Sequence, residues 1–93
     1  MVSGSETDRQ RVVLVVDDEH GIRLLLRRYL EREGYRVVEA ADGAAALAVL
    51  ATQPIDLAVV DVMMPKVDGF ELVRQVRARS DLPVILLLSL IHI

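Results

Sequence analysis

The 93-residue sequence contains no cysteine, few aromatic residues (3%) and no excess of positive charge. Without cysteine, disulfide bonds and thiolate metal sites are excluded. Because aromatic side chains are scarce, the core must be built mainly from Val, Leu, Ile and Ala, and the hydrophobic share of 53% is large enough for one. The formal net charge of −3 argues against a surface that binds nucleic acid directly.

The sequence also lacks a hydrophobic segment that resembles a signal peptide or a membrane-spanning helix. Residues 1–10 are polar and charged without periodicity, and we expect them to form a mobile leader. The longest apolar stretch begins at Leu82 and is too short to cross a bilayer. These absences predict a cytoplasmic protein without a membrane partner.

Apolar runs and helical patterns alternate along the rest of the chain. The runs at 12–16 and 57–60 are apolar at every position, which is typical of strands buried on both faces of a parallel sheet, whereas 35–39 is mixed and fits a sheet edge. In chain order, the sequence predicts strand 12–16, helix 22–30, strand 35–39, helix 43–52, strand 57–60, helix 70–77 and strand 84–88. This alternation predicts an α/β fold with helices on the faces of a parallel sheet.

The helical patterns predict which side chains face the sheet. In the first helix the apolar positions at helical spacing are Ile22, Leu25, Leu26, Tyr29 and Leu30. The opposite, arginine-rich face, which includes Arg23 and Arg27, is expected to be solvated. Asp42 is expected to cap the second helix. The third helix is expected to turn inward Phe70, Val73 and Val76.

Three carboxylates are predicted to meet at one edge of the sheet. With right-handed crossovers, the simplest strand order is second, first, third, fourth, which places the carboxyl ends of the first and third strands at the topological switch point. Asp17 and Asp18 follow the first strand, and Asp61 follows the third. Neighbouring strands lie ~4.8 Å apart, and two like charges ~4 Å apart repel by about 4 kcal/mol at an effective dielectric near 20. Such a cluster needs a proton or a cation, and oxygen ligands alone favour Mg²⁺.

The motifs at these positions resemble those of the response-regulator receiver family. Residues 15–19 (VVDDE) resemble its acidic pair, 61–69 (DVMMPKVDG) its phosphorylation loop, and 39–43 (EAADG) the segment after its second strand. The resemblance runs from about residue 11 to 87 and implies a flavodoxin-like, doubly wound parallel sheet with strand order 2-1-3-4. Residues 11–87 are therefore expected to be a partial receiver domain.

The resemblance also implies a role for each site residue. Asp61 would be the nucleophile that becomes an aspartyl phosphate. Asp18 and Asp61 would bind Mg²⁺ through carboxylate oxygens, Met63 through its backbone carbonyl, and Asp17 through an ordered water molecule. The phosphoryl donor would be a phosphohistidine on a sensor histidine kinase, so the domain would not be a stand-alone enzyme. Similarity to receivers of winged-helix transcription factors implies a DNA-binding output domain in the parent protein.

The sequence departs from the family pattern near its end. Receivers carry a hydroxyl residue at the end of the fourth strand, but that position holds Leu88, and Ser89 stands one place late. Residues 88–93 (LSLIHI) match one reading frame of a common transposon-end sequencing adapter, so a non-native tail is expected there. The fifth strand and the last two helices of a receiver are then missing, and the all-apolar fourth strand forms an unprotected edge.

Other function classes fit less well. An aspartate after a strand is also common as a turn or capping residue, but two such sites at one switch point favour a functional cluster. A haloacid-dehalogenase-type phosphatase needs a second aspartate where Met63 stands, and no glycine-rich nucleotide-binding motif is found. The remaining alternative is an inert fragment or a pseudo-receiver that acts only as a protein-interaction surface.

Overall fold

A computed structural model describes residues 10–62, 69–78 and 80–87 of the chain. In chain order, the elements are β1 (Val12–Val16), α2 (His20–Arg32), β2 (Arg36–Ala40), α3 (Gly43–Thr52), β3 (Leu57–Asp61), α4 (Gly69–Arg77) and β4 (Val84–Leu87). All seven predicted elements are confirmed, with ends that shift by one to a few residues. The expected leader, apart from Gln10, and the expected tail at 88–93 lie outside the described residues.

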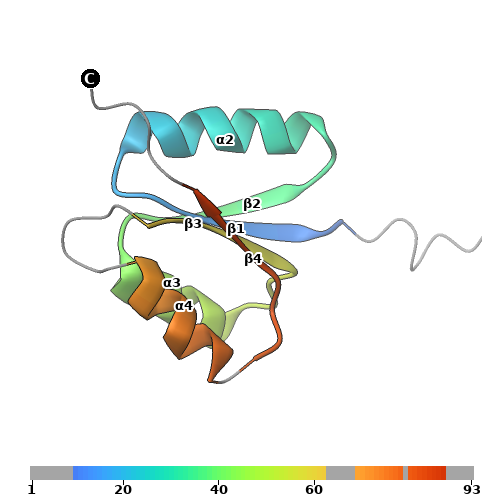
Figure 1. Ribbon diagram of the computed structural model, residues 1–93. Helices are drawn as coiled ribbons and strands as arrows, with labels where there is room; N and C mark the ends of the chain where they lie inside the picture. The colour runs from blue at the N-terminus through green and yellow to red at the C-terminus, as the bar shows by residue number, and fades with distance from the viewer. Residues whose placement is uncertain (1–9, 63–68, 79, 88–93) are drawn as a thin grey trace, which may run out of the picture.

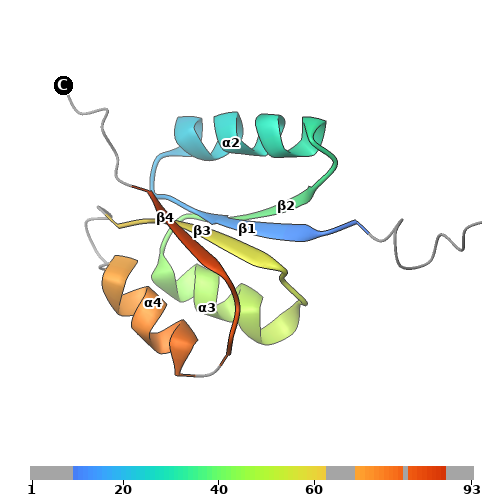
Figure 2. The ribbon, with the colours of Figure 1, turned by 45° about the vertical axis from the view of Figure 1, so that its right-hand side comes forward.

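The four strands form one parallel sheet in the order β2-β1-β3-β4. Figures 1 and 2 show α2 on one face of this sheet, and α3 and α4 on the other. The predicted strand order and the doubly wound α/β architecture are therefore confirmed. Among the described residues, no helix has the length and hydrophobicity needed to span a membrane.

The central strand β1 is buried along its whole length. Because side chains alternate across a strand, β1 contributes to a separate hydrophobic layer on each face. Leu14 and Val16 pack with residues of α3 and α4, whereas Val13 and Val15 pack with residues of α2. Full burial on both faces explains why this run has no polar position.

The cap of α3 forms as predicted. The side chain of Asp42 accepts a hydrogen bond from the backbone N–H of Ala45 at 2.8 Å, which satisfies one of the free donors at the helix N-terminus. This bond fixes the start of α3 at Gly43, three residues after the end of β2 at Ala40.

The predicted inward faces of α2 and α4 are partly wrong. Leu25, Tyr29 and Phe70 are 65%, 57% and 58% exposed. Successive helical residues are rotated by about 100°, so Leu25 and Tyr29 lie beside the inward, partly buried stripe of α2 that contains Leu26 and Leu30. In α4 the inward stripe contains Leu72 and Val76, and Phe70 lies about 200° around the helix from Leu72.

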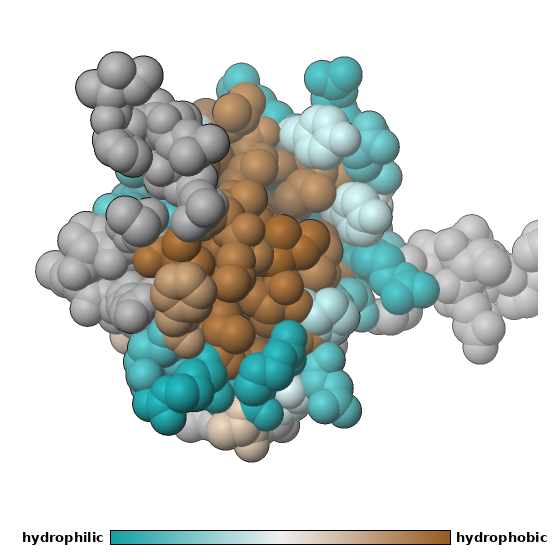
Figure 3. Space-filling model, in the orientation of Figure 1, coloured by the Kyte–Doolittle hydropathy of each residue, from teal (hydrophilic) through white to brown (hydrophobic). Residues whose placement is uncertain are grey.

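The strand β4 is an exposed apolar edge of the sheet. Within the described residues it pairs only with β3, and Ile85 and Leu86 are 50% and 42% exposed. In Figure 3, hydrophobic residues form a continuous area across the middle of the face on which β4 lies in Figure 1. An unpaired apolar edge is a template for pairing with another strand.

We therefore predict that the 93-residue chain self-associates through this edge, and that Ile85→Lys weakens the association because a charged side chain opposes edge pairing. Sedimentation velocity over a range of concentrations measures the effect. Leu25→Lys, which adds the same charge at an exposed position on α2, is the control and should leave the association nearly unchanged. Equal effects of both substitutions would show that the β4 edge is not the contact.

Candidate functional site

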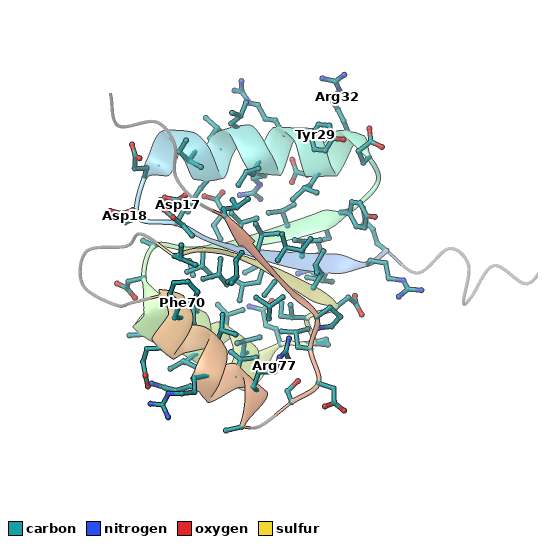
Figure 4. All side chains as sticks on the ribbon, in the orientation of Figure 1. Asp17, Asp18, Tyr29, Arg32, Phe70 and Arg77 are labelled. Carbon is teal, nitrogen blue, oxygen red and sulfur yellow. The ribbon has the colours of Figure 1, made fainter. Side chains whose placement is uncertain are left out.

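The carboxyl ends of β1 and β3 bring three aspartates together. Val16 pairs with Val60 across the two parallel strands, so the residues that come next, Asp17 and Asp61, lie side by side. Asp18 follows Asp17, and one carboxylate oxygen from each of the three residues lies within 4.8 Å of the others. Figure 4 shows Asp17 and Asp18 together at this end of the sheet, where the chain leaves β1 for α2. The predicted convergence is confirmed.

The three carboxylates differ in their exposure to solvent. Asp17 and Asp61 are each 2% exposed and are the buried charged residues of the described part of the chain, whereas Asp18 is exposed. Burying a charge is unfavourable unless it is paired, protonated or bound to a metal. The site therefore consists of two buried acids at the carboxyl ends of β1 and β3, which form its floor, and one acid that is exposed to solvent.

The pKa of Asp17 is raised from 3.8 to about 6, mainly by burial and also by the negative charges of Asp61 and Asp18. The backbone N–H of Glu19 donates a hydrogen bond to the Asp17 carboxylate at 2.9 Å, which opposes this rise. The Asp17 carboxylate is thus ionised at neutral pH but destabilised in its charged form, a state that a bound cation would relieve.

The donor set fits Mg²⁺. The three residues offer only hard oxygen ligands, which Mg²⁺ prefers, and it binds them at about 2.0–2.1 Å. Oxygens bound to one ion then lie up to about 4.2 Å apart, so a spread of 4.8 Å leaves room for direct binding by some carboxylates and binding through water by another. The third predicted protein ligand, the backbone carbonyl of Met63, lies outside the described residues.

The segment that joins β1 to α2 is held by contacts that the sequence did not reveal. The N–H of Asp17 donates to the carbonyl of Ala40 at 3.1 Å, and the guanidinium of Arg23 donates to the carbonyl of Asp17 at 2.7 Å. The side chain of Arg23 is only 14% exposed, so the prediction that this arginine belongs to a solvated face is wrong. The mixed strand 35–39 offered a clue to this contact, because its glutamate, Glu39, is half-buried and favours a cationic partner.

Comparison with known families agrees with this geometry. The profile of the response regulator receiver domain family matches residues 13–90. The match ends inside the segment 88–93, where the sequence predicts a non-native tail, and that boundary stays a prediction. A probable transcriptional regulator, ycf27, from Cyanidium caldarium is 42% identical over 89 residues. The match covers 96% of this chain but 36% of that protein, so the chain spans about a third of its relative's length.

Two response regulators of known structure have folds similar to that of this chain. The chemotaxis response regulator CheY4 of Vibrio cholerae is 38% identical with a TM-score of 0.80, and the match covers 84% of this chain and 68% of CheY4. The response regulator TrrA from Thermotoga maritima, solved with Mg²⁺ and BeF, is 34% identical with a TM-score of 0.76, and the match covers 85% of this chain and 68% of that one.

A solved complex of the histidine kinase ThkA with TrrA contains a chain that is 37% identical to this one, with a TM-score of 0.82 and coverage of 89% and 72%. The strand order, the acidic cluster at the switch point and these similarities agree with the resemblance found in the sequence. On these grounds, the chain belongs to the response regulator receiver domain family, whose members are signalling modules of two-component systems.

Proposed function

We propose that this receiver domain accepts a phosphoryl group on Asp61 with the help of Mg²⁺ bound at the acidic cluster. The observation that carries the proposal is the meeting of Asp17, Asp18 and Asp61 within 4.8 Å, two of them buried, at the carboxyl ends of adjacent strands. A purely structural role seldom explains acids that are gathered in a buried position, because the repulsion between the carboxylates opposes folding.

Each acid has a distinct role in this proposal. The carboxylate of Asp61 is the nucleophile, and the end of β3 holds it in the buried floor of the site. Asp18 and Asp61 bind Mg²⁺ directly, together with the backbone carbonyl of Met63, while Asp17 binds it through a water molecule. When bound, Mg²⁺ offsets the negative charge that gathers on the phosphoryl oxygens during transfer.

The proposed donor is a phosphohistidine on a sensor histidine kinase. A carboxylate oxygen of Asp61 attacks the phosphorus atom and forms an O–P bond. The P–N bond breaks, and its electron pair passes to the imidazole, which leaves as a neutral ring because its other nitrogen carries a proton. The complex of ThkA with TrrA supports a partner of this class. Because the donor comes from a partner and the acceptor is consumed, the domain takes part in the transfer without being a stand-alone enzyme.

The setting of the domain follows from the same proposal. We place it in the cytoplasm, and we expect its longer parent protein to carry a DNA-binding output domain, since a relative of which it spans 36% is a probable transcriptional regulator. The chain itself, with a net charge of −3, is not expected to bind nucleic acid. The intact acidic cluster speaks against the alternative of a pseudo-receiver that acts only as an interaction surface. The other alternative, an inert fragment of a receiver, would keep the cluster, and the phosphorylation assay below distinguishes it from an active domain.

Incubation with acetyl phosphate and Mg²⁺ is expected to give one labile phosphoryl adduct, detected by intact-mass spectrometry. Asp61→Asn should abolish it, because the amide is not a nucleophile at neutral pH. The control is Asp81→Asn, an exposed aspartate before β4 at the other end of the sheet, which should keep the adduct. An adduct that persists in Asp61→Asn, or that the unsubstituted chain does not form, would refute the assignment.

Mg²⁺ is expected to raise the free energy of unfolding, because it binds the folded state alone. The gain reaches about 2.7 kcal/mol when the free ion is at about 100 times its Kd. Asp18→Ala should reduce this gain by removing one ligand, whereas Asp81→Ala should not. Chemical unfolding with and without Mg²⁺ measures the difference. Equal stabilisation of Asp18→Ala and the parent would exclude Asp18 as a direct ligand.

Without metal, Asp17→Asn is expected to make the protein more stable at pH 7.5, by about 1–3 kcal/mol. The pKa of Asp17 is raised from 3.8 to about 6 in the folded state. Ionised Asp17 therefore lowers the free energy of unfolding in full above pH 6, and the effect vanishes well below pH 3.8. The advantage of Asp17→Asn should therefore shrink as the pH falls through 6 towards 3.8. The asparagine keeps the oxygen that accepts from Glu19. Unfolding curves in a chelator from pH 4 to 7.5 test this, and a pH-independent difference would contradict it.

A further inference from the structure

We propose that Arg23 is a positioning residue for the metal site: it fixes the peptide group between Asp17 and Asp18 and thereby sets the affinity for Mg²⁺. The inference rests on the proposed binding of Mg²⁺ at Asp17, Asp18 and Asp61. It concerns a side chain on α2 that offers no oxygen ligand and whose guanidinium is directed at the backbone of the site.

The guanidinium of Arg23 makes two short hydrogen bonds and a longer contact of 3.4 Å with Nδ1 of His20. One terminal nitrogen donates to the backbone carbonyl of Asp17 at 2.7 Å, and Nε donates to Oε1 of Glu39 at 3.0 Å. The side chains of Arg23 and Glu39 are 14% and 20% exposed. A guanidinium has its donors in a rigid plane, so these two bonds together define its orientation.

The carbonyl of Asp17 belongs to the same planar peptide group as the N–H of Asp18. A bond that holds this carbonyl therefore fixes the direction in which the backbone of Asp18 continues and its carboxylate is presented. The peptide group on the other side of Asp17 is also fixed, since its N–H donates to the carbonyl of Ala40 at 3.1 Å. Arg23 thus holds one of the two peptide groups that determine where the acidic pair points.

Arg23 is itself held by a second arginine. Glu39 accepts from Arg27 at 2.7 Å through its other oxygen, Oε2, and Arg27 also donates to Glu31 at 3.1 Å. The hydrogen bond from Arg27, followed by that from Arg23, lowers the pKa of Glu39, so this carboxylate remains an acceptor for both arginines at neutral pH. The chain of contacts runs from the solvent face of α2 through β2 to the turn that carries the site.

Three readings of Arg23 predict different signs for its removal. If Arg23 acted only through its positive charge, Arg23→Ala would strengthen the binding of Mg²⁺, because like charges repel. If it only joined α2 to β2, the substitution would lower stability and leave the Mg²⁺ affinity of the folded protein unchanged. If it positions the acidic pair, the affinity falls, by about 10- to 100-fold as for other groups that orient metal ligands.

The test is a titration of the ¹⁵N-labelled 93-residue protein with Mg²⁺, followed by the backbone amide signals of the folded state, of which Asp18 is the most direct reporter. We expect Arg23→Ala to weaken the affinity about 10- to 100-fold and to shift the Asp18 amide signal before metal is added. The Mg²⁺ affinity of Arg23→Lys should lie between those of Arg23→Ala and the unsubstituted chain, since one ammonium group can bind a single acceptor well but not both. Glu39→Gln, which keeps an oxygen for Arg23, should have a smaller effect than Arg23→Ala.

The matched control is Arg28→Ala, an exposed arginine on the same helix, which should leave the affinity unchanged. If the unsubstituted chain binds Mg²⁺ and the Arg23→Ala variant binds it with equal or higher affinity, the positioning role alone is overturned. If the unsubstituted chain does not bind Mg²⁺, the proposed function is overturned, and this inference with it. Should Arg23→Ala not fold, an affinity of Arg23→Lys equal to that of the parent would still overturn the inference.

Discussion

The carboxylates of Asp17 and Asp61 are buried next to one another at the ends of two hydrogen-bonded strands, although their charges repel. The sheet makes this possible because β1 is paired on both sides and packed on both faces, so its end cannot move away from that of β3. Hydrophobic burial along β1 favours folding, and part of that free energy offsets the cost of holding the acids together. The core and the site are thus two ends of the same strand pair.

The two faces of the sheet support the site differently. On the face of α3 and α4, Leu14, Val16 and their neighbours form an apolar layer, which holds the floor in place by packing. On the face of α2, the polar contacts of Arg23 with Glu39 and with the Asp17 backbone add directed bonds close to the acidic turn. Packing fixes the strands, and hydrogen bonds fix the peptide groups that follow them.

Much of the fold and the acidic cluster could be predicted from the sequence, because short, valine-rich runs such as 12–16 have no polar position, which is typical of a strand buried on both faces. Strand ends could then be placed at a common edge by topology alone. The facing of helix residues could not be predicted as well. Leu25 and Leu26 are both apolar neighbours, and only the packing against the sheet decides that Leu26 is inward. The contacts of Arg23 could not be predicted either, because its partners lie on β2 and in the turn after β1, and neither is next to it in the chain.

All strand pairs of the described sheet are parallel, so each joins segments that are distant in the sequence, as when Val13 pairs with Leu57. Pairing of this kind requires long chain loops to close before any contact is gained, which slows folding. Asp61 cannot approach Asp17 and Asp18 until β3 has docked on β1, so no partly assembled chain contains the acidic cluster. A ligand bound there therefore reports on the pairing of β1 with β3, and a nascent chain would acquire the site only after its third strand has been synthesised and docked.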